Sequence, residues 1–199
     1  MKFSDIPKYC INLPWRTDRR EHAETEFKRF GMEVNFIDGI DGKGYGKKGN
    51  WGNILAQSSV IKKATTEYTC IFEDDVCFCD DFLQRMEYVE KSGVDFDVFY
   101  IGGWYKNKSK PIDKYLFEVN DMAGTHGYIL KNTTYKFITE TIGEANGMDQ
   151  YLSDYVLKKF RGVIFLPVMA GTIAGFSDIQ KCHVNYNNSF NVFNKEAVL

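Results

Sequence analysis

Three features that would point to common protein classes are missing from this sequence: a long apolar run, an excess of basic residues and a cysteine pair with zinc-ligand spacing. A membrane-spanning helix needs about 20 consecutive apolar residues, and the N-terminal residues MKFSDIPKYC lack the apolar core of a signal peptide. We therefore expect a cytoplasmic protein with no membrane span. The formal net charge of −2 argues against a nucleic-acid partner, because proteins that bind nucleic acids usually carry a basic excess.

The cysteines give no sign of a metal cluster. One residue separates Cys77 from Cys79, whereas paired zinc ligands usually have two residues between them, and no second pair exists. Cys10 and Cys70 lie inside apolar strand patterns and are expected in the core. With Cys182, the five cysteines form an odd number, and we interpret all of them as reduced thiols.

Length and composition favour one globular domain. The chain has 199 residues, of which 44% are hydrophobic and 26% are charged, and these proportions are ordinary for a globular protein with a sizeable core. No repeat, low-complexity tract or linker divides the sequence. We therefore expect a single domain over residues 1–199.

Short strand patterns alternate with amphipathic helical patterns along the chain. The alternation predicts an α/β fold with a mainly parallel central sheet flanked by helices. Two short strands, at 115–119 and 127–131, are expected to have an antiparallel relation. The other predicted strands are 8–13, 34–37, 69–73, 98–101 and 163–168; the predicted helices end near 30, span 53–66 and 80–92, and begin at Asn132 and Asp149; the predicted loops and tail are 38–52, 104–113 and 170 onward.

The sequence TCIFEDDV at 69–76 joins a buried-strand pattern to three consecutive carboxylates, Glu73, Asp74 and Asp75. Ligands of open α/β sheets bind outside the carboxyl ends of the strands, where these acids are expected. Carboxylate oxygens suit Mg²⁺ or Mn²⁺. Glu73 and Asp75 alternate, so an extended backbone would place them on one face and Asp74 on the other. The alternative is a solvated acidic turn that caps the next helix.

The acidic motif is one of an ordered set of short segments. The set comprises CINLPWRTDRR at 10–20, FIDGIDG at 36–42, GNWGNILAQSSVIKKA at 49–64, IFEDDV at 71–76, DVFYIG at 97–102, AGTHGYIL at 123–130, MDQYL at 148–152 and FSDIQ at 176–180. In sequence and order these segments resemble family 25 glycosyltransferases, the group that includes lipooligosaccharide and collagen galactosyltransferases.

The resemblance implies a GT-A fold and an inverting, metal-dependent hexosyltransferase. Its cofactor would be Mn²⁺ or Mg²⁺, its donor a UDP-sugar, either UDP-galactose or UDP-glucose, and its acceptor a glycan or a glycosylated protein. Asn53 and Gln57 depart from the family pattern, because many bacterial members are expected to have Cys and His there. The residues expected at the site are Asn12, Leu13, Arg16, Arg19, Asp38, Gly39, Asn53, Glu73 and Asp74 for the donor, Asp75, Glu73 and His183 for the metal, and Asp149 for catalysis.

The arginines after the first strand are candidates to hold phosphate. Asn12 and Arg16 lie at the carboxyl end of that strand, where a base and its phosphates would be held. Arg19 and Arg20 begin the next helix, where a cation costs roughly 0.5 kcal/mol against the helix dipole, so a bound anion would compensate. The alternative, solvated charge on a first turn, is the better interpretation of Arg20.

For two histidines and two aspartates, the sequence leaves a functional and a structural interpretation open. His183, in the polar tail, is a candidate to close over the metal, and the alternative is an exposed surface imidazole. His126, within GTHG, is either a core histidine or part of an acceptor site. Asp38 and Asp41 can accept hydrogen bonds from ribose or uracil, although Asp-Gly pairs are also common turn formers.

Asp149 is the candidate general base. Inverting transfer needs a group that takes the proton of the acceptor hydroxyl on the side opposite the leaving diphosphate. Asp149 follows a flexible turn and begins a predicted helix, whose N-terminus stabilises an ionised carboxylate. The alternative is a plain N-cap, since Asp is a preferred capping residue. Asp178 is the main competitor for the role of base.

Two other functions remain open. The first is a catalytically silent GT-A domain that binds a nucleotide sugar or a protein partner, although such a domain has no need to retain Glu73, Asp74, Asp75 and Asp149. The second is a nucleotidyltransferase, which also uses paired acids. It is disfavoured because no glycine-rich phosphate loop with a conventional lysine follows the first strand.

Overall fold

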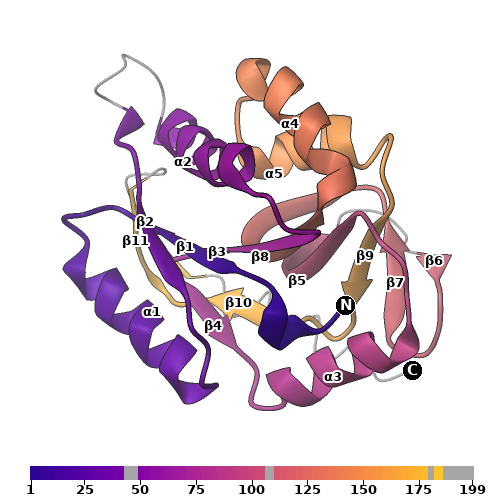
Figure 1. Cartoon of the computed structure of the whole chain (residues 1–199). Coiled ribbons are helices and arrows are strands. Elements are labelled where there is room, and N and C mark those ends of the chain that lie inside the picture. Colours follow the sequence, from indigo (N-terminus) through magenta and orange to yellow (C-terminus); the bar gives the residue numbers. More distant parts are fainter. Residues whose placement is uncertain (43–48, 106–109, 179–181, 186–199) are drawn as a thin grey trace.

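One central sheet runs through the protein, in the strand order β2-β1-β3-β8-β5-β9-β7-β6. The computed structural model describes residues 1–42, 49–105, 110–178 and 182–185 (Figure 1). The strands are β1 (Lys8–Asn12), β2 (Asn35–Asp38), β3 (Tyr68–Glu73), β4 (Val76–Phe78), β5 (Val98–Tyr105), β6 (Lys110–Pro111), β7 (Leu116–Val119), β8 (Met122–Lys131), β9 (Gly162–Phe165), β10 (Ala170–Thr172), β11 (Gly175–Ser177) and β12 (Cys182–Val184).

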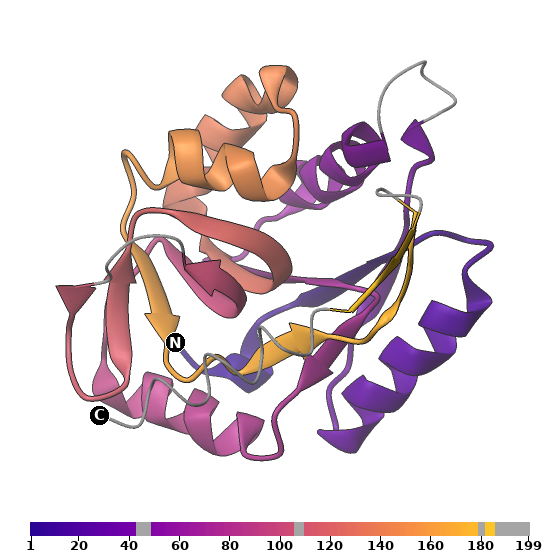
Figure 2. The same ribbon diagram turned by 180° about the vertical axis from the view of Figure 1, so that it is seen from behind.

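Helices cover both faces of this sheet. In Figures 1 and 2, α2, α4 and α5 lie on one face, and α1 and α3 lie on the other. The helices are α1 (Thr17–Arg29), α2 (Gly49–Lys63), α3 (Phe82–Ser92), α4 (Tyr135–Thr141) and α5 (Met148–Tyr151), which continues as a π-helical turn, Leu152–Val156; short 3₁₀ turns span Phe3–Asp5, Asn132–Thr134 and Ile142–Glu144. No described helix is both long enough and apolar enough to cross a membrane.

Strand directions make the sheet mixed. β1 runs parallel to both β2 and β3, and β5 runs parallel to β9. The long β8 separates these two parallel blocks, because it pairs antiparallel with β3 and with β5. The predicted α/β fold with a helix-flanked central sheet is confirmed. The antiparallel relation predicted between the strands at 115–119 and 127–131 is wrong, because the two do not pair: β7 is antiparallel to β9, and β8 is antiparallel to β3 and β5. Since β5 and β9 are parallel, β7 and residues 127–131 of β8 run in the same direction.

Alternation along β3 divides the core into two apolar clusters. Ile71 points to the cluster under α2, α4 and α5, whereas Cys70 and Phe72 point to the cluster over α1 and α3. All three side chains are completely buried. The two-sided burial explains why the β3 sequence is apolar at successive positions, and Glu73 continues the alternation toward α2.

Two differences from the predicted elements arise near the site. The strand predicted to stop at Gly102 and Gly103 continues to Tyr105, because a bulge at these glycines shifts the register without ending the pairing with β8. Gly103 has a φ of 146°, which favours glycine. Strand β4 is too short for a sequence signal and forms by antiparallel pairing with β10.

Helix α2 begins earlier than predicted, at Gly49, and ends at Lys63. Of its predicted inner residues, Ile54, Ser58 and Ile61 are buried and Leu55 is half-buried. Parts of the predicted loops and tail, namely residues 43–48, 106–109, 179–181 and 186–199, lie outside the described residues.

Candidate functional site

The acidic motif lies where β3 leaves the centre of the sheet. Glu73 is the last residue of β3, Asp74 and Asp75 form the following turn, and β4 begins at Val76. Glu73 lies opposite Ile11 of the parallel strand β1. The acids therefore share an edge with the carboxyl end of β1, which is where ligands of open α/β sheets bind.

Glu73 is held through one of its two carboxylate oxygens. Oε1 accepts hydrogen bonds from Thr125 Oγ1 at 2.6 Å and from Asn53 Nδ2 at 3.3 Å. Burial raises the pKa of Glu73, but His126 and these two donors outweigh burial, so that the pKa lies below its ordinary value. Glu73 is therefore ionised at neutral pH.

A buried chain of polar side chains continues from Asn53 into the core. Gln57 donates Nε2 to Asn53 Oδ1 at 2.6 Å, and the Tyr128 hydroxyl donates to Gln57 Oε1. Gln57 is completely buried. Asn53 and Gln57 thus support Glu73, because the hydrogen bond between their side-chain amides orients the Asn53 NH₂ group that donates to Glu73.

Asp74 points toward α1. Its Oδ2 accepts a hydrogen bond from Asn12 Nδ2 at 2.8 Å, and its Oδ1 accepts one from Arg19 Nη1 at 2.9 Å. Burial raises the pKa of Asp74, and the Arg19 charge and the Asn12 hydrogen bond oppose that shift. Asp74 therefore ties the motif to β1 and α1.

The two carboxylate oxygens of Asp75 have different surroundings. Its Oδ2 lies 3.1 Å from Arg19 Nη1, whereas its Oδ1 is buried with no hydrogen-bond partner among the described residues. Burial and then repulsion by Glu73 raise the pKa of Asp75 to about 6. Leaving a buried carboxylate oxygen unpaired is costly, so this atom marks a place that a ligand or cation would occupy.

His126 reaches the same place from β8. Its side chain is 6% exposed, and neither ring nitrogen has a hydrogen-bond partner among the described residues. Glu73, Asp75 and His126 each offer one ligand atom, and these atoms lie within 4.8 Å of one another. Two carboxylates and an imidazole form a donor set that fits a divalent metal ion.

Two arginines of the N-terminal segment connect the motif to the hairpin β11–β12. Arg16 Nη1 and Arg19 Nη2 both donate to the Phe176 carbonyl, at 3.3 and 3.0 Å. Arg16 also pairs with Asp178. The anions that face Arg19 in this structure are the acids of the motif itself.

His183 lies on this hairpin, in β12, with an exposed side chain. Its ring meets the Phe176 ring edge-on, with the centroids 5.6 Å apart. It is not in the group formed by Glu73, Asp75 and His126. Its assignment to the metal stays a prediction, as does the role of the FSDIQ segment, of which residues 179–180 lie outside the described residues.

The ends of β1 and β2 bring the other donor-binding candidates together. Asn12 lies opposite Asp38, and the Gly39 N–H donates to the Asn12 carbonyl at 2.7 Å. A Cβ at Gly39 would lie 3.1 Å from Leu13, so a larger residue would crowd this contact. The Asp38 side chain is exposed beside them.

Asp149 is the second residue of α5, and the N-cap of that helix is Gly147. Asp149 Oδ2 accepts a hydrogen bond from the Gly124 N–H at 3.1 Å, and Oδ1 accepts one from the Gln150 N–H at 2.8 Å. Its carboxylate is thus tied to β8, two residues before His126. The consecutive residues 124–126 therefore contact both Asp149 and Glu73.

Sequence reasoning missed Thr125 and did not assign His126 to the metal. The available signal was the pair of glycines in GTHG. A Cβ at Gly124, where φ is 76°, would come within 2.9 Å of the His126 ring, and one at Gly127 would come within 2.8 Å of Phe72. Gly124 thus permits close packing against the His126 ring, and Gly127 permits close packing of β8 against Phe72.

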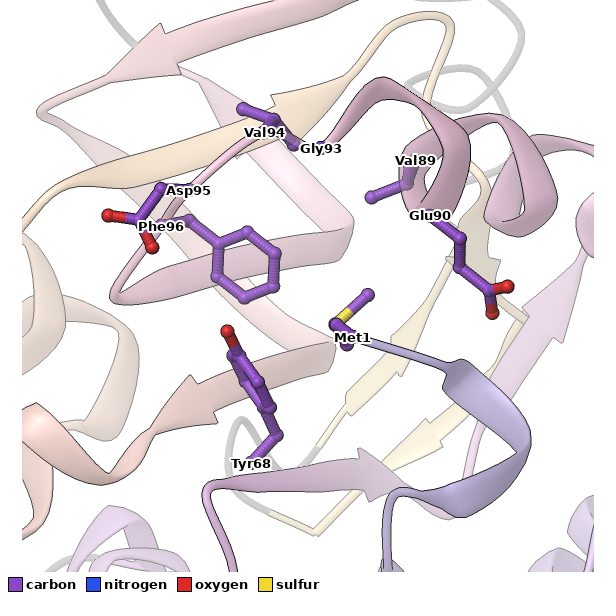
Figure 3. A pocket seen from close by; sticks show the side chains of 8 residues that line it. All are labelled: Met1, Tyr68, Val89, Glu90, Gly93, Val94, Asp95 and Phe96. Atoms are coloured by element: carbon purple, nitrogen blue, oxygen red, sulfur yellow. The ribbon is translucent and has the colours of Figure 1, made fainter.

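A separate hollow of ≈ 140 Å³ lies at the other end of the sheet. Figure 3 shows the side chains that surround it. Tyr68 begins β3 and Phe96 precedes β5, so the hollow adjoins the amino ends of the strands and not the acids. Its lining residues are Met1, Tyr68, Val89, Glu90, Gly93, Val94, Asp95 and Phe96.

Comparison with known sequences gives one weak match. A scan against models of protein families finds none that matches the chain. Procollagen galactosyltransferase 2 from Mus musculus is 29% identical over 133 residues, which cover 51% of this chain. The matched region is 21% of that relative, so the chain spans only a fraction of its length.

Comparison with solved structures shows the fold. A glycosyltransferase involved in the glycosylation of the major capsid of PBCV-1 superposes with a TM-score of 0.53 and 11% identity, covering 94% of this chain and 98% of that one. A197 from STIV has a TM-score of 0.53 and 14% identity, covering 90% and 93%. The protein has a glycosyltransferase-like fold of the GT-A type. The weak galactosyltransferase match agrees with a glycosyltransferase-like fold, whereas membership of family 25 stays a prediction.

Proposed function

We propose that this protein is an inverting, metal-dependent hexosyltransferase that uses a UDP-sugar, with galactose or glucose as the transferred hexose. The observation that carries the proposal is the group formed by the half-buried Glu73 and Asp75 and the buried His126 at the carboxyl end of β3. Asp74 and Asp75 share one guanidinium, that of Arg19, while the ionised Glu73 faces Thr125, Asn53 and His126, which leaves an excess of negative charge. A divalent ion would neutralise this excess and would in turn attract a diphosphate.

The donor would lie over the ends of β1 and β2. Asn12, Leu13, Asp38 and Gly39 meet there, next to the acidic motif. Arg16 borders the same edge and supplies a cation for the diphosphate, while Asn53 and Asp74 orient the motif. The exposed Asp38 carboxylate is available to accept hydrogen bonds from a ribose.

Transfer requires that the acceptor oxygen bonds to the anomeric carbon while the bond from that carbon to the diphosphate oxygen breaks. A bound metal ion would stabilise the charge that develops on the leaving diphosphate. Asp149 would take the proton of the acceptor hydroxyl, and the two N–H donors on its carboxylate hold it in one orientation. Glu73 and Asp75 would hold the metal ion, and Asp74 and Arg19 keep Asp75 in place.

A donor-hydrolysis screen tests the proposal. Purified protein is incubated with a panel of nucleotide sugars, with and without Mn²⁺, and the released nucleoside diphosphate is measured. We expect release from UDP-galactose or UDP-glucose that depends on metal and is lost in Asp75→Asn. Release from no sugar nucleotide under any metal condition, even with glycan and glycoprotein acceptors added, contradicts an enzymatic role.

Two further assays address the rival functions. A silent domain would bind UDP in calorimetry without any turnover. A nucleotidyltransferase would release pyrophosphate from a nucleoside triphosphate and a sugar 1-phosphate. We also propose that the acceptor is a glycan or a glycosylated protein. The cytoplasmic location is likewise a proposal.

A further inference from the structure

The environment of His126 is unusual for a core histidine. The residue is 5% exposed, and neither Nδ1 nor Nε2 has a hydrogen-bond partner among the described residues. A polar group that is removed from water normally recovers its hydrogen bonds inside the protein. Apolar packing alone therefore gives no reason for a histidine at this position.

The imidazole is also fixed in orientation. Its ring packs edge-on against Trp104, with centroids 4.7 Å apart, and its Nε2 side faces Gly124 so closely that a Cβ there would lie 2.9 Å away. These contacts turn Nδ1 toward Glu73 Oε2, at 3.7 Å. That distance is too long for a hydrogen bond. It does suit two ligands of one metal ion, because atoms bound at about 2.1 Å to a shared ion lie roughly 3 to 4 Å apart.

Both carboxylates leave one oxygen for the same ion. Glu73 Oε1 is taken by Thr125 and Asn53, which leaves Oε2 on the His126 side. Asp75 Oδ2 faces Arg19, whereas Asp75 Oδ1 is buried without a partner. The unused atoms of three side chains from β3, its following turn and β8 thus converge.

We propose that His126 is the third protein ligand of the metal ion, and that it gives the site two properties. Three protein ligands bind the ion before any nucleotide arrives. The imidazole nitrogen favours Mn²⁺, Fe²⁺ or Co²⁺ over Mg²⁺, which prefers an all-oxygen set. The inference rests on the proposed function only in that the same ion would later contact the donor diphosphate.

Metal binding without nucleotide tests the proposal. In calorimetry at neutral pH we expect the parent protein to bind one Mn²⁺ at least about 10-fold more tightly than Mg²⁺. His126→Asn should weaken Mn²⁺ binding by about 10- to 100-fold, since mutating even the hydrogen-bond partners of metal ligands has effects of that size. The variant should also have a smaller difference in affinity between Mn²⁺ and Mg²⁺. Unchanged Mn²⁺ affinity in His126→Asn, or no Mn²⁺ binding by the parent without nucleotide, overturns it.

The other two histidines supply the controls. His22 lies on α1 with Nε2 at 2.8 Å from the Val76 carbonyl, so it already has a partner. His22→Asn should therefore bind Mn²⁺ as the parent does. His183→Asn examines the rival ligand from the hairpin, and a loss of affinity in that variant, with none in His126→Asn, also overturns the proposal.

A spectroscopic measurement covers the case in which His126→Asn does not fold. Electron spin-echo modulation of Mn²⁺ bound to the parent protein should show coupling to an imidazole ¹⁴N, and the coupling should persist in His183→Asn. Absence of the ¹⁴N signal refutes the proposal. Nitrogen-ligated Mn²⁺ in a protein that hydrolyses no nucleotide sugar would instead refute the proposed function and leave this inference standing.

Discussion

The two ends of the central strands both bury charge, but they treat it differently. At the amino end, Lys8 is 5% exposed, and its Nζ donates to the Phe3 and Ile6 carbonyls at 2.7 and 2.9 Å. Nearby, Glu90 Oε1 accepts a hydrogen bond from the Phe3 N–H at 2.6 Å. The buried charge at this end has protein partners and serves to tie the first turn to the sheet.

At the carboxyl end, buried polar atoms are left unsatisfied. Asp75 Oδ1, both ring nitrogens of His126 and Thr172 Oγ1 have no hydrogen-bond partner among the described residues. Thr172 lies opposite Val76, directly beside the acidic turn. Burial of a charge therefore does not distinguish a site from a structural feature in this protein. Several unsatisfied atoms gathered at one turn do, because their cost is recovered when something binds there, whereas the Tyr100 hydroxyl is a single unsatisfied atom inside the apolar core.

The largest expected effect comes from Asp75→Asn. We expect transfer or donor hydrolysis to fall by about 10³-fold, since losing metal stabilisation of the leaving group is worth several kcal/mol. Without metal, the variant should melt no lower than the parent, because burial and Glu73 disfavour the charge of Asp75 and raise its pKa to about 6. Parallel kinetics and thermal melts check both parts, and full activity with saturating Mn²⁺ would show that Asp75 is not a ligand.

Asp149→Asn should have the next largest effect. Loss of a general base costs about 10²-fold or more in turnover, while donor hydrolysis by water should be less affected than transfer to an acceptor. The melting temperature should fall only slightly, because the Asn oxygen can still accept one of the two N–H groups that Asp149 accepts, from Gly124 or Gln150, and the helix cap is Gly147. Normal transfer rates at an unchanged melting temperature would remove Asp149 from the mechanism.

Gly124→Ala and Gly93→Ala compare the two ends directly. Both glycines have positive φ, 76° and 64°, so each substitution should cost about 1 kcal/mol or more of the free energy of unfolding. At Gly124 the new Cβ also meets the His126 ring at 2.9 Å, whereas nothing lies within 4 Å at Gly93. We expect only Gly124→Ala to weaken Mn²⁺ binding. Equal loss of affinity in both variants would mean that the effect is global.

Much of the fold could be predicted from local sequence because the central strands β1, β3, β5, β8 and β9 are buried on both faces. The apolar run before Glu73 required a central strand, and β3 is one. The position of β8 could not be predicted, because its pairing with β3 and β5 joins residues distant in the sequence. The same holds for β4, whose three residues form a strand only through pairing with β10.

The site shows the same division. The carboxylates could be identified from the sequence, because three adjacent acids repel one another and stability alone does not explain their clustering. His126 does not, since a single histidine beside a strand has many ordinary explanations. Its relevance comes from β8 lying next to β3, which brings it to Glu73. Similarly, nothing local indicates that Gln57 and Tyr128 support Asn53.

The smallest expected effect concerns Lys8 at the amino end. Burial lowers the pKa of Lys8 below its ordinary value of 10.5, and nearby Cys70, Asp5 and Glu33 only partly oppose it. The folded protein therefore gives up this proton more readily than the unfolded chain. It follows that the contribution of Lys8 to stability rises with pH in the interval that ends near the unfolded pKa, 10.5.

Lys8→Met keeps the length of the side chain and removes the titration. Plotted against pH, the difference in the free energy of unfolding between parent and variant should change in favour of the parent as the pH rises toward the unfolded pKa of 10.5. Mn²⁺ affinity and donor hydrolysis should not change, because Lys8 begins β1 and the acids lie beyond its other end. Urea titrations at a series of pH values measure the difference. A pH-independent difference would show that Lys8 is not desolvated, and a loss of Mn²⁺ affinity would show that the two ends of the strands are coupled.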